Sequence, residues 1–342
     1  MVDTNTDLLL ANLLSAANTG NSEIYTNFNS TLLTDLSVAP YYDDNDIENN
    51  YHRIIFRPGY AVQARELTQI QTMIQDQINR FGKHVFKEGS IVLGGSFSLE
   101  TKFAYVKVKD VDDQGRPINI GHYLGQTIRS PLTNLTAFIY KVADGNESDS
   151  NTKTIYVRYT NSGNNSETVF SPDETLVCDQ GNLVILPSNR TPTGFGSIFV
   201  VREGVFFAKN HFIAFKTQSV ILSRYDSNPT CRVGFIILEE IVRHNRDASL
   251  LDPALESSNY SAPGADRLKL TPVLTRLELT DNPGPPDYVD LFSIKQGVIQ
   301  EIFERTQYDR LGDEFAKRTF DESGDYYVHG MTVRLREHLN NG

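Results

Sequence analysis

The chain has 342 residues, of which 39% are hydrophobic and 22% charged, and its formal net charge is −11. This length predicts two domains or one elongated domain, and the composition is that of a globular protein. No apolar run is long enough to span a membrane, and the first residues lack the pattern of a signal peptide. The acidic charge argues against a duplex nucleic-acid binder. The only cysteines, Cys178 and Cys231, build neither a disulfide framework nor a thiolate zinc site.

The first fifty residues contain no lysine or arginine, against eight acidic residues. Such a segment buries too little apolar surface to fold alone, so residues 1–50 are predicted to form an extended arm. We expect a neighbouring chain to order this arm, through a basic groove with pockets for its leucine clusters. The candidate docking residues are Leu8, Leu9, Leu10, Leu32 and Leu33.

The clearest periodic signal follows Tyr51–Phe56, which is predicted to be a strand or an extended entry ended by Arg57-Pro58-Gly59. A helix is predicted from Ala61 to Phe81, with Gly82 as its stop. One face of this helix carries an apolar stripe made of Leu67, Ile70, Ile74, Ile78 and Phe81. Two interpretations stay open: the stripe covers a sheet of its own chain, or it is a self-association surface between symmetry-related copies.

Beyond Gly89 the sequence pattern becomes that of β-strands, with period-two alternation and turns rich in Asn, Asp, Ser and Gly. The predicted strands cover residues 102–109, 155–159, 197–202, 205–222 with a hairpin tip at Lys209-Asn210, 231–242, 267–270, 291–294 and 298–302. A last helix, from Tyr308 to Thr319, should turn Leu311 and Phe315 inward. A further strand should begin at Asp325.

The predicted fold class is therefore α+β and β-dominated. Hairpin-rich β modules should combine with one long amphipathic helix near the N-terminus and a shorter helix near the C-terminus, in an elongated molecule. The predicted organisation is an acidic arm at 1–50, a strand–helix core segment at 51–100, a polar β module at 101–190, a β-hairpin module at 191–290, and a hairpin with a helix at 291–342. The last segment should lead into a further domain, so the natural protein is expected to continue past Gly342.

No catalytic or ligand-binding pattern emerges from the sequence. The seven histidines show no metal-ligand spacing, and Gly121 stands where a calcium loop beginning at Asp110 needs its bidentate glutamate. Asp43-Asp44-Asn45-Asp46 is interpreted as a solvated acidic loop rather than a cation site. Nucleophile elbows, phosphate loops and dinucleotide fingerprints are missing. We therefore expect no catalytic residue, no metal, no cofactor and no enzymatic activity.

Three long motifs carry a resemblance to a known family. They are YHRIIFRPG with VQARELTQIQ within residues 51–71, LLDP with APGADRL within residues 250–268, and FAKRTFDESGDYYV at residues 315–328. Together they resemble an uncharacterised structural-protein family of tailed bacteriophages, known mainly from cyanobacterial and marine contractile-tailed phages. The resemblance spans Tyr41 to Gly342 and implies a virion tail component without catalytic residues.

The leading hypothesis is a structural protein of a phage tail, acting as a baseplate component or a connector that anchors tail fibres. One alternative is a tail module that binds host glycans as a receptor, and a less favoured alternative is a polysaccharide-cleaving tail enzyme. The expected partners are other tail or baseplate proteins and further copies of this chain, with a trimer favoured, and neither nucleic acid nor a membrane. The expected location is the virion, with synthesis in the host cytoplasm.

Overall fold

The computed structural model describes residues 32–46, 49, 51–147, 151–164, 167–280, 284–302 and 309–325. These residues form an α+β, β-dominated architecture of antiparallel sheets with a long helix before them and a shorter one after them, as the sequence predicts. The helices are α2 (Ala64–Val85) and α3 (Asp309–Ser323), with short 3-10 turns η3 (Ile120–Tyr123), η4 (Ser188–Arg190) and η5 (Ala248–Leu250). No helix in this described part is long and apolar enough to cross a membrane.

The strands of the described residues form four sheets. The six-stranded sheet has the order β11-β8-β2-β5-β4-β3, and it is accompanied by the sheets β1-β9-β10, β13-β12-β14-β15 and β6-β7. Their bounds are β1 (Ile91–Gly94), β2 (Phe97–Lys107), β3 (Thr127–Arg129), β4 (Thr136–Ala143), β5 (Thr154–Tyr159), β6 (Thr175–Leu176), β7 (Leu183–Val184), β8 (Thr193–Val201), β9 (Gly204–Ala208), β10 (His211–Phe215), β11 (Gln218–Ser223), β12 (Cys231–Val242), β13 (Arg267–Glu278), β14 (Tyr288–Lys295) and β15 (Val298–Ile302).

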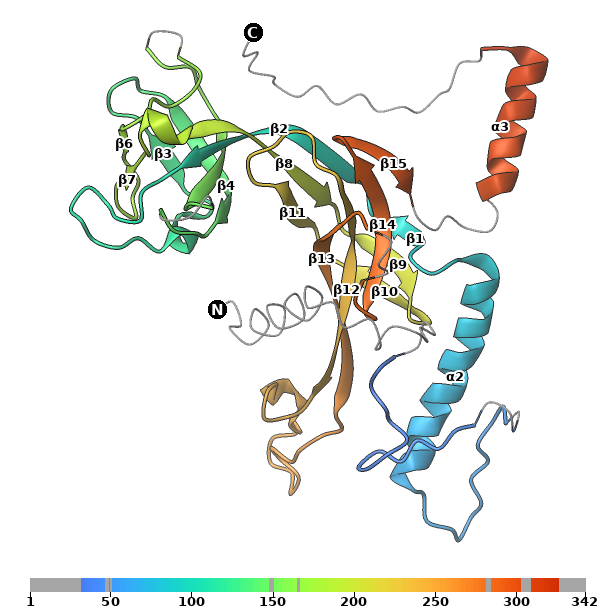
Figure 1. The fold of residues 1–342 in the computed structure, drawn as a ribbon. Helices are drawn as coiled ribbons and strands as arrows, with labels where there is room; N and C mark the ends of the chain where they lie inside the picture. Colours follow the sequence, from blue (N-terminus) through green and yellow to red (C-terminus); the bar gives the residue numbers. More distant parts are fainter. Residues whose placement is uncertain are drawn as a thin grey trace.

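The largest hydrophobic core lies between the sheet β13-β12-β14-β15 and the strands β8 to β11. Aromatic rings fill its centre: Phe206 stacks near Phe235 with ring centroids 4.9 Å apart, and Phe199 lies 5.1 Å from Phe292. The outer halves of β12 and β13 pair only with each other beyond this core. They continue as a two-stranded ribbon on the same side of the molecule as α2 (Figure 1).

A second core belongs to residues 108–192, between β2 and β8, which we call the distal module. Its buried side chains come from β3 to β7, η3 and the end of β2, and Figure 1 shows these strands in green, away from α2. The chain enters and leaves the module side by side, since Lys107 N donates to Pro192 O at 2.7 Å and Leu186 N donates to Lys107 O at 3.1 Å. The chain thus passes into and out of the module at the neighbouring strands β2 and β8, and the module is also held by the pairing of β5 with β2.

The strand predictions locate most of the sheets correctly. Lys209 and Asn210 both take positive φ, 48° and 65°, and connect β9 to β10 as the predicted hairpin tip. The predicted segment 205–222 is broken a second time, between β10 and β11, because the chain passes from one sheet to another there. Residues 51–56 are not part of any sheet, although they were predicted as a strand or an extended entry. Most of the strand predicted from Asp325 lies outside the described residues.

Helix α2 does not stop at Gly82, which corrects the prediction. The helix continues to Val85, and Gly82 is one of its two buried residues. A Cβ atom at this position would lie 2.6 Å from Cε2 of Phe207, which is itself buried. Gly82 therefore allows α2 to approach the β9–β10 hairpin closely and does not serve as a helix cap.

Helix α3 also differs from its prediction. Leu311 and Phe315 were expected to face inward, but they are 55% and 58% exposed. Their spacing of four residues does place them on one face of the helix, as the pattern required. The sequence period identifies which face is apolar, but it does not specify what that face contacts.

A half-buried lysine, Lys141, connects two non-adjacent strands of the six-stranded sheet. Lys141 on β4 reaches across to β11, where its Nζ contacts the backbone oxygen of Ser219 and lies 3.1 Å from Ser219 Oγ. No ion pair with a carboxylate accompanies this amine among the described residues. Burial lowers the pKa of Lys141 to about 8, because the charged form loses its hydration.

The Lys141→Met variant should be more stable than the wild type at pH 7, by about 1–2 kcal/mol. A pKa of about 8, against an ordinary 10.5, corresponds to roughly 3 kcal/mol of penalty for the charged amine, part of which its hydrogen bonds offset. The lowered pKa also makes wild-type stability rise between pH 8 and about 10, since the unfolded chain there binds more protons than the folded one. Urea unfolding at pH 7, 8, 9 and 10 should show this rise in the wild type but not in the variant. Equal slopes in both proteins would contradict the prediction.

Candidate assembly surface

The described part of the N-terminal arm, residues 32–46, connects two projecting elements of its own chain. We call this segment the strap. At one end Leu33 N and Thr34 N donate to the carboxylate of Glu239 on β12, at 3.0 and 2.8 Å. Further along, Tyr41 donates its hydroxyl to Asp266 beside β13 at 2.7 Å. The strap then reaches α2, so it bridges the β12–β13 ribbon and the helix (Figure 1).

The strap binds the polar face of α2. Arg65 pairs with Asp44 at 2.9 Å, and Gln69 donates to the same carboxylate. Thr72 donates to Asp43. These three helix residues lie on one face, and at about 100° per residue that face is opposite the apolar stripe. The carboxylates of Asp43 and Asp44 thus accept hydrogen bonds from side chains of the helix, and Arg65 also neutralises the charge of Asp44.

Glu239 holds the other end of the strap within a buried ionic cluster. Lys209 Nζ lies 2.7 Å from Glu239 Oε1 and also contacts Asp287, and these side chains are only 4%, 6% and 14% exposed. Burial opposes ionisation of Glu239, but the hydrogen bonds from Lys209, Leu33 and Thr34 outweigh it and keep the pKa of this carboxyl below its usual value. Glu239 therefore stays charged at neutral pH and anchors the strap.

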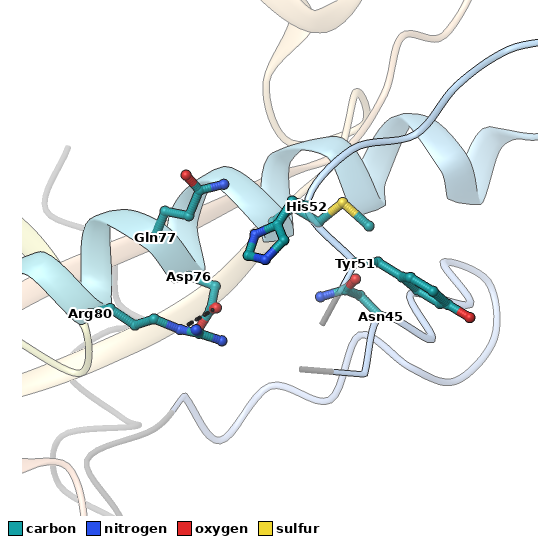
Figure 2. Close-up of a pocket in the computed structure, with 7 residues that line it drawn as sticks. Asn45, Tyr51, His52, Asp76, Gln77 and Arg80 are labelled. Atoms are coloured by element: carbon teal, nitrogen blue, oxygen red, sulfur yellow. Dashed lines mark ion pairs between the residues drawn. The ribbon is translucent and has the colours of Figure 1, made fainter. Parts of the chain in front are cut away.

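A shallow hollow lies between the helix and the segment that follows the strap. It is lined by Asn45, Tyr51, His52, Met73, Asp76, Gln77 and Arg80 (Figure 2). Asp76 and Arg80 pair across one turn of the helix at 3.0 Å. The hollow encloses about 20 Å³, the space of a single water molecule. This arrangement suits packing of the segment against α2 rather than binding of a substrate.

The apolar stripe of α2 faces solvent along most of its length. Leu67, Ile74, Ile78 and Phe81 are 52%, 53%, 41% and 67% exposed, and Ile70 is half-buried. The expectation that this stripe covers a sheet is therefore wrong. An amphipathic helix normally buries its apolar face on its own chain and leaves its polar face wet. In α2 the polar face instead binds the strap, and the apolar face is exposed to solvent.

The chain leading into α2 is apolar and exposed as well. Ile55 is 81% exposed, and Tyr51, Phe56, Tyr60 and Val62 also lie open to solvent. Arg57 packs its guanidinium over the ring of Tyr60, 4.9 Å from the centroid, and Gly59 supplies the positive φ of 87° in this turn. We call residues 51–62 the entry loop. With the stripe of α2 it forms the candidate assembly surface.

The structure places the predicted arm residues in different situations. Leu33 is exposed and Leu32 is half-buried, while the backbone of residues 33 and 34 binds an acidic residue of the same chain. This part of the arm was predicted to bind a basic groove on a neighbouring chain. In the structure it binds Glu239, an acidic residue of its own chain. Leu8, Leu9 and Leu10 lie outside the described residues, so docking of the first part of the arm stays a prediction.

Sequence reasoning did not foresee the exposure of the entry loop or the contacts of the strap. Residues 51–56 were predicted to be a strand or an extended entry ended by Arg57-Pro58-Gly59, and in the structure they lie outside the described sheets. Asp43 and Asp44 were interpreted as part of a solvated loop, but they are the contacts of the strap with α2. No local pattern could identify their partners, which lie more than twenty residues away. Among the described residues no cluster of His, Cys, Asp or Glu is arranged to hold a metal ion.

The chain belongs to the family described as "Domain of unknown function (DUF4815)", which matches residues 39–112 and 196–342. The match includes the entry loop, α2 and the large core, and it leaves out most of the distal module. No curated protein and no solved structure matches the chain. The shared part of the family is thus the part that carries the candidate assembly surface.

Proposed function

We propose that this protein is a structural subunit of a bacteriophage tail, a baseplate component or a connector that anchors tail fibres, and that it works through protein–protein assembly. The proposal rests on the orientation of α2 in the fold. Its polar face is bound by the strap and its apolar stripe is exposed, the opposite of an ordinary amphipathic helix. A contiguous apolar surface of this kind is typical of a contact with another protein.

The phage assignment is supported by the three motifs that resemble a tail-protein family, at residues 51–71, 250–268 and 315–328. The first of these motifs is the entry loop together with the first part of α2. Residues of this motif are exposed rather than buried, so their sequence is not explained by the core of the chain. An assembly role gives these exposed residues a function. The protein acts without catalysis, as a part of the virion.

The proposal is tested in the phage whose genome encodes this chain. Mass spectrometry of purified particles should detect the protein, and an amber mutation in its gene should give particles with incomplete tails. Purified particles without the chain would refute the structural role. Complete tails that no longer adsorb to the host would instead favour the receptor-binding alternative. Turnover of host polysaccharide, lost on changing one Asp or Glu, would favour an enzyme.

A further inference from the structure

We infer that the apolar stripe of α2 binds the α2 stripe of a second copy of this chain. The inference rests on the proposed assembly function and names the partner at the same surface. Three observations bear on it: which faces of the helix are already occupied, which residues flank the stripe, and how much surface is exposed.

The occupied faces leave one direction free for a partner. The strap binds through Arg65, Gln69 and Thr72, and Gln75 on a side face donates to the backbone oxygen of Asn210 at 2.9 Å. The segment after the strap covers a further side, around Met73 and Asp76. Figure 2 shows His52 and Tyr51 on this side of the helix. Within the part of the chain that the structure describes, the stripe is the face without such cover, so a partner meets α2 there.

The residues that border the stripe are suited to an identical partner. Gln71 and Gln77 are exposed and lie beside it, Arg65, Asp76, Arg80 and Lys83 project elsewhere, and Glu66 is turned to the backbone N–H of Gln63. A glutamine amide carries both donors and an acceptor, so it pairs with the same residue of another copy. Two chains of net charge −11 repel each other in general, but no like charges meet along this line. A partner that is recognised through its charge would require charged residues beside the apolar stripe.

The exposed area is also of the right size. Leu67, Ile74, Ile78 and Phe81 together expose on the order of 450 Å², and the flanking glutamines add to this. Two facing stripes therefore approach the lower end of specific interfaces, roughly 1,200 Å² in total. The entry loop follows directly in sequence and can extend the contact. In a closed assembly the helices lie around a rotation axis.

Disulfide trapping tests this contact. Ile74 is the central residue of the stripe, so it meets its counterpart whether two helices pair in parallel or antiparallel orientation. The Ile74→Cys variant should form covalently linked copies under mild oxidation. Lys83 is exposed and lies on the opposite side of α2, nine residues further on, so Lys83→Cys is the matched control and should stay unlinked. Both native cysteines are buried and do not compete.

The oligomeric state provides the second measurement. Light scattering should give the wild type a molar mass that is a multiple of 38.5 kDa, and Ile74→Asp should reduce it to 38.5 kDa while the chain stays folded and still unfolds cooperatively. A monomeric wild type at tens of micromolar, with no cross-link at position 74, would overturn the inference. If Ile74→Asp still blocked incorporation into tails in that case, the partner is another tail protein and the proposed function stands. A disulfide within one chain in the double variant Ile74→Cys, Phe315→Cys would assign the stripe to α3 and would likewise overturn the inference.

Discussion

Replacing Lys209 by methionine should destabilise the protein by about 3–5 kcal/mol, the largest effect expected for a single substitution. The change leaves the carboxylates of Glu239 and Asp287 close together and buried without a cation. Methionine has a similar volume and the same tolerance for the positive φ at this position, so packing and backbone strain change little. The free energy of unfolding in urea at pH 7 measures the loss.

The pH dependence separates this electrostatic effect from a general packing defect. Without the hydrogen bond from Lys209, the pKa of the buried Glu239 carboxyl should rise, so the deficit of the variant should shrink as the pH falls from 7 to 4. In the wild type the pKa of Glu239 is lowered, and the stability that its charge contributes is lost as the pH falls through that folded-state value. Lys102→Met, on the exposed side of β2, is the control and should change stability by no more than about 0.5 kcal/mol. A pH-independent deficit would contradict the ionic account.

Replacing Gly82 by alanine should cost about 1–3 kcal/mol, although alanine is the better helix former. The new methyl group would lie 2.6 Å from the ring of Phe207, which Phe212 packs against at a centroid distance of 5.1 Å. That ring is buried and has little room to move. The expected structural result is a loosened α2, visible as faster proteolysis of the helix relative to the β-sheets.

The same substitution at Gly312 is a matched control for Gly82. Gly312 lies within α3, and a Cβ atom built there meets nothing within 4 Å. Gly312→Ala should therefore be neutral or stabilise the helix by up to about 1 kcal/mol. If both alanine variants behaved alike, the close approach of α2 to the β9–β10 hairpin would not be what requires glycine at position 82.

The two helices show which structural features the spacing of apolar residues can predict and which it cannot. The spacing of Leu67, Ile74 and Phe81 is sufficient to predict a helix and its apolar stripe, because both depend on residues three or four apart. It is insufficient to predict that this stripe faces solvent, because that depends on the strap and on Thr72 and Arg65, whose partners lie far away in sequence. The same limit explains why Leu311 and Phe315 were expected to be buried.

Local turn chemistry was more informative than helix periodicity. Lys209 and Asn210 occupy the two-residue tip of a hairpin, a position with strict conformational requirements that a short stretch of sequence reveals. The same lysine also pairs with Glu239 and Asp287, which no spacing rule connects to it. The hairpin was therefore predictable, whereas the ionic cluster that anchors the strap was not.

The junction between β2 and β8 has a practical and evolutionary consequence. Because the backbone enters and leaves residues 108–192 at hydrogen-bonded neighbours, the length of the chain between these two points can vary without drawing the ends of β2 and β8 apart. The family match breaks off at residue 112 and resumes at residue 196, close to these two points. Sequence added in the loops of residues 108–192, such as an epitope or a fluorescent reporter, would thus leave the point where the module joins β2 and β8 in place.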